Sequence, residues 1–402
     1  MKLFVTGVFL FCIINVFSQN VVNSSEKEIV FRGVNVVPMD KEEILRDQTV
    51  VIKDGRITAM GNSSSVKFSE DALVIDAHGK YLMPGLAEMH AHVPPNDNLQ
   101  SHKDVLMMFA LHGITTIRGM LGHPSHLDLR NKINSGEIMG PELYTSGPSF
   151  SGGSVHSPAE AEQKVREQEK AGYDFLKIHP GLTIENFAAV AKTAKQEDIP
   201  FAGHISYAVG VWNSINAGYQ TIDHLDGFVE GIVPGIENIP ENEAGLFGMY
   251  IAGRADEKKI PALTKQLKEH NVWVVPTQAL AERWISSART AESFARDPEM
   301  KYMQPGNLRN WVNAKSGIQK NEKYDSAKIA DYIKLRRKII YACHKSGVGL
   351  LLGCDAPQVF NVPGIATHHE LQYLVDAGLT PYEALRTGTI NVAKFYKKNG
   401  KM

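Results

Sequence analysis

The 402-residue sequence predicts an α/β protein, a (β/α)₈ TIM-like barrel preceded by a small β domain. Eight short apolar runs follow residue 86, and amphipathic or polar stretches of helical length separate most of them. Repeated strand–helix alternation is typical of a parallel barrel, and 43% hydrophobic residues suffice for a large core. A doubly wound open sheet is the competing topology, but no G-x-G-x-x-G turn follows an early strand.

The N-terminus has the pattern of a secretory signal peptide. Lys2 precedes the apolar stretch 3–17, which ends at Ser18. A membrane-spanning helix needs about 20 apolar residues, so a retained anchor is the weaker interpretation. We therefore expect residues 1–18 to be a signal peptide and the mature protein to be secreted or periplasmic.

Residues 19–83 predict the N-terminal part of a small β domain. Asp54-Gly55 separates two β-prone segments, 49–53 and 56–60, and this dipeptide is a strong signal for a two-residue hairpin. A further short strand is expected at 74–76.

Residues 84–398 predict the barrel. The eight strand candidates are 86–93, 114–119, 143–147, 175–179, 201–205, 221–225, 272–276 and 349–355. Segments 157–160 and 380–383 each combine an N-cap residue, a proline and a capping-box glutamate, which predicts helix starts. The longer segments 227–271 and 281–327 are expected to be insertions that shape a substrate pocket.

Several strand candidates end in residues that can bind a metal. These residues are His90, His92, His204, His224 and Asp355. In a parallel barrel the carboxyl ends of the strands converge on one face, and nitrogen and oxygen ligands of this kind suit Zn²⁺ or a similar ion. Taken singly, each histidine has a structural alternative, and Asp355 could simply begin a turn. Their occurrence on separate predicted strands favours a metal site.

Lys177 interrupts an otherwise apolar strand candidate. An ammonium group cannot bind metal, and a buried lysine is costly unless it is paired. Reaction of its amine with CO₂ would give a carbamate, an anionic group with two oxygen ligands. The alternative is a lysine that reaches solvent or pairs with Asp174.

With these residues in place, the chain resembles the amidohydrolase superfamily of metal-dependent hydrolases. The resemblance rests on Pro84-Gly85-Leu86, the five ligand candidates, Lys177 and the C-terminal stretch 367–391. Within the superfamily it is similar to the subgroup of imidazolonepropionase and prolidase-like Xaa-Pro/Xaa-Arg dipeptidases.

The resemblance implies a site for two divalent metal ions, with zinc as the expected metal. His90, His92 and Asp355 would hold one ion, and His204 and His224 the other. Carboxylated Lys177 and a hydroxide would bridge the two ions. Asp355 would also be catalytic, because it would accept the proton of the attacking water and return it to the departing amine.

Four further residues are weaker candidates around this site. Tyr207, His156 and Arg118 are candidate substrate contacts, with a surface loop histidine and an internal ion pair as the alternatives for His156 and Arg118. His179 is expected to support the ligands through hydrogen bonds rather than bind metal itself.

The resemblance also implies that the small β domain is an incomplete β-sandwich. Family members continue past the barrel with strands that complete this domain, whereas the present sequence stops at Met402. The sequence is thus either a C-terminally truncated fragment or a chain with an incomplete β unit.

The leading functional hypothesis is hydrolysis of a carbon–nitrogen bond in an amide, peptide or cyclic amide. A lactonase or phosphotriesterase on the same metals is the nearest alternative, and an inactive binding protein is the third. The formal net charge of −1 gives no reason to expect nucleic acid or a membrane surface as partner. We expect a small-molecule substrate and consider a homo-oligomer compatible with the sequence.

Overall fold

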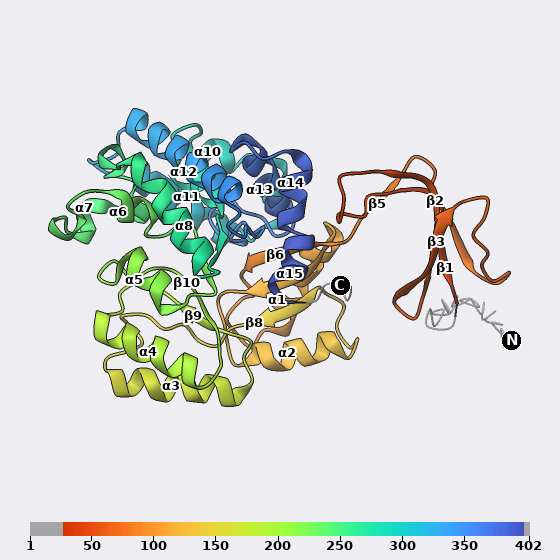
Figure 1. Cartoon of the computed structure of the whole chain (residues 1–402), viewed down its shortest axis with the longest axis horizontal. Helices are drawn as coiled ribbons and strands as arrows, with labels where there is room; N and C mark the ends of the chain where they lie inside the picture. Colours follow the sequence, from red (N-terminus) through yellow and green to blue (C-terminus); the bar gives the residue numbers. More distant parts are fainter. Residues whose placement is uncertain (1–26, 398–402) are drawn as a thin grey trace, which may run out of the picture. The chain divides into compact units, whose positions relative to one another are not determined.

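The computed structural model describes residues 27–397, which form two compact units (Figure 1). Among the described residues one unit comprises 27–38 and 43–83, and the other comprises 39–42 and 84–397. The expected signal peptide, residues 1–18, lies outside the described part. Within that part, no helix combines the length and the apolar character needed to span a membrane.

The N-terminal unit is one mixed sheet of five strands. Its strands are β1 (Ile29–Val36), β2 (Leu45–Lys53), β3 (Arg56–Asn62), β4 (Leu73–Asp76) and β5 (Tyr81–Leu82). The order is β3-β2-β1-β4, and β5 pairs with β1. The predicted hairpin joins β2 to β3, with positive φ of 51° at Asp54 and 70° at Gly55, as a type I′ turn requires. Within 27–83 the strands form this single sheet, so a sandwich is not confirmed.

The larger unit contains parallel strands in chain order. They are β6 (Leu86–Ala91), β7 (Ile114–Gly119), β8 (Glu142–Thr145), β9 (Leu176–Ile178), β10 (Phe201–Gly203), β11 (Thr221–Asp223) and β12 (Trp273–Val275). Strands β6–β8 form one sheet and β9–β12 another, and every pair is parallel. Seven of the eight expected runs are therefore strands.

Isolated parallel bridges connect these two sheets and the eighth run. Ser146 pairs with Phe175 between β8 and β9. The eighth run, 349–355, forms no regular strand, but bridges connect this part of the chain to both sides, from Leu350 to Val274 and from Ala356 to Ala91. The metal-ligand candidate Asp355 is thereby held beside β6.

Helices follow most strands of the larger unit. They are α1 (Leu99–Leu111), α2 (Ser125–Asn134), α3 (Pro158–Ala171), α4 (Ile184–Gln196), α5 (Gly210–Ala217), α6 (Phe228–Ile232), α7 (Glu241–Ala244), α8 (Ile260–Glu269), α9 (Gln278–Leu280), α10 (Ala291–Phe294), α11 (Pro305–Gln319), α12 (Ser326–Ser346), α13 (Ile365–Asp376), α14 (Pro381–Thr387) and α15 (Ile390–Phe395). The mixed α/β character that the sequence predicts is confirmed.

Both predicted helix starts occur, with a difference in detail. Helix α14 begins with the full capping box between Thr380 and Glu383. At α3, Ser157 caps the helix through the Glu160 amide, but the Glu160 carboxylate accepts from the His156 amide instead. The capping-box pattern therefore located both helices, although only one box closes.

Candidate metal centre

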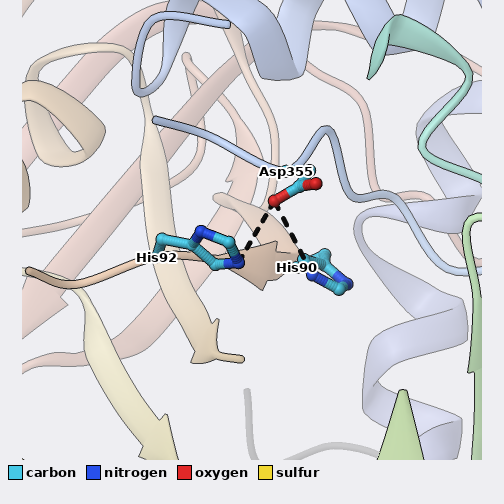
Figure 2. Close-up of side chains that lie close together, drawn as sticks. All are labelled: His90, His92 and Asp355. Carbon is cyan, nitrogen blue, oxygen red and sulfur yellow. Dashed lines mark ion pairs between the residues drawn. The ribbon is translucent and has the colours of Figure 1, made fainter. Parts of the chain in front are cut away.

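Two histidines and an aspartate converge at the end of β6 (Figure 2). The Nε2 atom of His92 lies 3.1 Å from Oδ1 of Asp355, and Nε2 of His90 lies 3.7 Å from the same oxygen. The amide of His92 donates to the Ala356 carbonyl at 2.8 Å, which fixes the two segments in register. Each residue offers one ligand atom within 4.8 Å of the others, so the three could hold one ion.

Two further histidines adjoin this group from the ends of the next strands. His204 follows β10 and His224 follows β11. The His224 ring centroid lies 4.4 Å from that of His90 and 4.4 Å from that of His204, and its Nδ1 lies 3.9 Å from Asp355 Oδ2. The four predicted histidines and Asp355 therefore form one continuous cluster.

In three of these four histidines, the Nδ1 atom has a protein partner. His90 Nδ1 lies 2.9 Å from Asp223, and His204 Nδ1 lies 3.0 Å from Asp226. A carboxylate at Nδ1 holds the proton on that nitrogen and leaves the Nε2 lone pair available. His224 Nδ1 similarly lies 2.9 Å from the Thr277 hydroxyl. This arrangement is typical of histidines that bind metal through Nε2.

Four polar atoms in and beside this cluster make no hydrogen bond. Within residues 27–397, Nε2 of His92, Nε2 of His224, Oδ1 of Asp355 and Nζ of Lys177 are buried and make no hydrogen bond. Buried polar atoms are normally satisfied, and an unpaired group costs free energy. A divalent cation with its bound oxygens would satisfy this donor set, so the residues present fit a metal.

Lys177 lies in β9, fully buried, beside this cluster. Burial lowers the pKa of its amine to about 8, although the Asp223 and Asp355 charges oppose the shift. The pairing with Asp174 does not occur, because Asp174 accepts from Arg130 and from the Thr145 amide, each at 2.8 Å. The Lys177 side chain does not reach solvent either, since the residue is 0% exposed.

Gly203 makes room for Lys177. A Cβ atom at residue 203 would lie 2.9 Å from Lys177 Cδ and 2.5 Å from the Ile178 carbonyl oxygen, and φ of Gly203 is +124°. Only glycine adopts this conformation without strain. The lysine chain therefore passes directly over the backbone of β10.

Burial sets the protonation states of the cluster. Burial lowers the pKa of His92 to about 3 and that of His179 to about 2, and the positive charge of Lys177 is the second cause in both cases. Burial also raises the pKa of Asp355 to about 7. The imidazoles are therefore neutral at pH 7, as metal binding requires, while the carboxylate lacks a sufficient countercharge.

The candidate substrate contacts occupy different environments. Tyr207 lines a cavity beside His204, and its hydroxyl donates to the Ile239 carbonyl at 2.8 Å. His156 is exposed, in agreement with the surface alternative. Arg118 is 1% exposed and donates to Met89, Thr221 and Asp223, so it takes the internal ion pair instead of meeting a substrate. The ring of His179 lies 5.0 Å from that of His204 between centroids, and the two rings are tilted by 53°.

Sequence reasoning missed the residues that hydrogen-bond to the ligand candidates. Asp223 precedes His224, Asp226 follows it by two positions, and Thr277 lies just beyond β12. Polar residues flanking a predicted ligand were a visible signal for Asp223 and Asp226. Thr277 gave no local signal, because its contact with His224 spans 53 positions.

Glu88 is the other missed residue, a buried acidic side chain that contacts the backbone of the ligand candidate His90. Its Oε1 accepts from the amides of His90 and Cys354 at 3.1 and 2.8 Å, and its Oε2 accepts from the Thr367 hydroxyl at 2.8 Å. It thus ties the backbone of β6 to the segment that carries Asp355. Its position two residues before His90, on the same strand face, was the signal available in the sequence.

Replacing Glu88 tests this tie between the two segments. We expect Glu88→Ala to lower the free energy of unfolding by about 2–4 kcal/mol, because two buried amides lose their acceptor. Glu88→Gln is the matched control, since its amide oxygen can still accept from both amides. Denaturant titration of the metal-free variants measures the effect. Equal stability of the two variants would show that these hydrogen bonds contribute little.

Comparisons with known proteins bear on the same part of the chain. The sequence model of the amidohydrolase family matches residues 81–401. The chain is 31% identical to the enamidase of Eubacterium barkeri over 144 residues, which is 34% of this chain and 36% of that protein. It is 22% identical to the ochratoxinase of Aspergillus niger over 429 aligned positions, covering 90% of this chain and 75% of that protein.

Solved structures and a further relative agree with this match. A Xaa-Pro dipeptidase with bound methionine superposes with a TM-score of 0.64 at 18% identity, covering 93% of this chain and 90% of that one. The imidazolonepropionase of Rhizobium rhizogenes is 23% identical over 229 residues, 54% of either protein. The predicted resemblance is thereby confirmed, and the chain belongs to the amidohydrolase family.

Proposed function

We propose that this protein is a metal-dependent hydrolase of carbon–nitrogen bonds in small amides or peptides. One observation carries the proposal: His90, His92 and Asp355 offer ligand atoms within 4.8 Å of one another, and Nε2 of His92, Nε2 of His224, the amine of Lys177 and Oδ1 of Asp355 are buried without a hydrogen bond. The names of the relatives, enamidase, ochratoxinase and Xaa-Pro dipeptidase, support the choice of bond.

The proposed site uses the chain's residues in two groups. His90, His92 and Asp355 would hold one divalent ion, and His204 and His224 a second, with zinc as the expected metal. Lys177, as its carbamate, would be a ligand of both ions. The carbamate forms when the neutral amine attacks CO₂ and the resulting carbamic acid loses its proton to solvent. When bound, divalent ions polarise a carbonyl and lower the pKa of water.

The chain supplies the remaining chemistry. Asp355 would accept a proton at Oδ1, which makes no hydrogen bond, and return it to the departing amine nitrogen. Asp223 and Asp226 would keep the rings of His90 and His204 in the required tautomer and orientation. We place these residues at the mouth of a closed (β/α)₈ barrel, for which the parallel bridges at Phe175, Leu350 and Ala356 are the support. We further propose export of the protein on the strength of residues 1–18.

Metal analysis and a substrate panel test the proposal together. Protein purified with Zn²⁺ or Mn²⁺ is expected to hold two ions per chain and to hydrolyse dipeptides or N-acyl amino acids, and a chelator should abolish turnover. Less than one ion per chain would support a binding protein instead. Turnover of lactones or phosphotriesters alone would overturn the choice of bond. A His156→Ala variant, altered at an exposed loop residue, serves as the control and should keep both metal and activity.

A further inference from the structure

A cavity of about 360 Å³ adjoins the metal-centre candidate on the side of His204. It lies between the ends of β10 and β11, helix α6 and the segment 236–247. Its apolar wall consists of Ile205, Val211, Trp212, Ile236, Leu246 and Phe247. A concave, mainly apolar space of this volume with few polar groups is typical of a small-molecule site.

The cavity is continuous with the proposed reaction site. His204, a ligand candidate, is part of its lining. The ring of Phe247 lies 6.2 Å from that of His204 and 5.4 Å from that of His224, measured between centroids. A molecule in the cavity therefore contacts the residues beside the reacting bond.

Three carboxyl groups line the cavity without a cationic side chain beside them. Asp226, Glu230 and Glu241 line it, and its described lining contains no lysine or arginine. The Asp226 carboxylate already makes hydrogen bonds with His204 Nδ1 and with the Ile205 amide. Glu241 is exposed to solvent. Glu230 alone brings a carboxyl group that is both buried and free to bind an occupant.

Glu230 forms no ion pair within residues 27–397. Its residue is 9% exposed, and its Oε2 atom is buried without a hydrogen-bond partner. Arg336 influences it only at a distance, because the guanidinium donates to Gln278, His224 and Pro276. Burial, together with the nearby Asp226 charge, raises the pKa of Glu230 to about 8. A buried carboxyl group of this kind is costly until a partner compensates it.

We propose that Glu230 binds a protonated amine of the substrate, so that the cavity selects amides carrying a primary ammonium group near the scissile bond. This inference rests on the proposed function and adds the substrate class to it. The ammonium would donate to the carboxylate of Glu230, and the alkyl chain that bears it would pack on Trp212 and Phe247. An aliphatic ammonium chain, such as that of lysine, fits within the cavity volume.

Matched substrates test the selection. The pairs are alanyl-lysine against alanyl-norleucine, and lysyl-alanine against norleucyl-alanine, which place the charge on either side of the amide. We expect the lysine member of at least one pair to have a kcat/KM about tenfold to a hundredfold higher, because hydrogen bonds between charged groups are of that strength. Equal kcat/KM values within both pairs would overturn the inference.

Variants assign the selection to Glu230. Glu230→Gln keeps the shape and removes the charge, so the preference for lysine should fall below about threefold. Glu230→Met should reverse the preference in favour of norleucine, since the cavity wall at position 230 then becomes apolar. Glu237→Gln removes one charge from an exposed residue outside the cavity and should leave the preference intact. Loss of the preference in Glu237→Gln would show a general charge effect instead.

A binding measurement separates this inference from the proposed function. Calorimetry compares 1-aminopentane with 1-pentanol, neither of which can be hydrolysed as an amide. We expect the amine to bind at least about tenfold more tightly to the unsubstituted zinc-treated protein and equally to Glu230→Gln. This result would stand even if no amide in the panel were hydrolysed. Tighter binding of the alcohol, or of pentanoate, would show that Glu230 acts as a neutral hydrogen-bond donor.

Discussion

Lys177→Met is expected to remove the metal and the activity while leaving the metal-free fold intact. Methionine is close in volume to lysine and replaces a buried amine that has no hydrogen-bond partner. The metal-free protein should therefore be at least as stable as before. Without the carbamate the ion content should fall below one per chain, and kcat/KM should fall on the order of 10³-fold or more, because water is no longer acidified.

Lys315→Met is the matched control for this substitution. Lys315 is also buried, but its Nζ donates to the carbonyls of Ser286 and Trp284 at 2.9 and 3.3 Å. Its replacement should cost about 1–3 kcal/mol of stability and leave the metal content unchanged. Elemental analysis and denaturant titration measure the two effects. If Lys177→Met kept two ions per chain and full turnover, the role assigned to Lys177 would be wrong.

Asp355→Asn is expected to lower kcat by about 10²–10⁴-fold. The carboxamide keeps the size of the side chain, but it cannot accept a proton from water and return it to a leaving amine. It also binds a cation less well, so the metal content should fall in parallel with the change in kcat. Steady-state kinetics over a range of added Zn²⁺ measures both contributions.

The outcome at saturating metal decides the role of Asp355. A kcat restored by excess Zn²⁺ would leave Asp355 as a ligand without a part in proton transfer. Asp376→Asn, at an exposed residue of α13, is the control and should match the unsubstituted protein in both kcat and metal content. A persistent loss of kcat in the fully loaded Asp355→Asn variant supports the proton-transfer role.

The sequence predicted most of the strand positions and the cluster of ligands for one physical reason. Parallel strands place their carboxyl ends together, so the histidines near the ends of several runs had to approach one another. This rule alone predicts that His204 and His224 lie close together, because each follows one of two neighbouring parallel strands. The eighth run was harder to predict, because 349–355 makes isolated bridges instead of a regular ladder.

The roles of Arg118 and Glu88 could not be predicted from the sequence, because they depend on contacts between residues far apart in the chain. Arg118 pairs with Asp223 across 105 positions, and Glu88 meets Cys354 across 266. No local pattern distinguishes such a buried arginine from one that meets a substrate. The cavity also depends on the segment 227–271, whose short helices α6 and α7 carry no strong periodic signal.

The residues that orient the histidines and the residues of 236–247 that line the cavity belong to different parts of the chain, which has a consequence for protein engineering. The carboxylates that orient His90 and His204 come from β11 and the turn after it, whereas Phe247 and Leu246 come from the separate segment. Replacing or exchanging that segment would alter which molecules enter while leaving the ring orientations unchanged. The scaffold should therefore accept libraries at 236–247 as a route to new amidases with a preserved reactive centre.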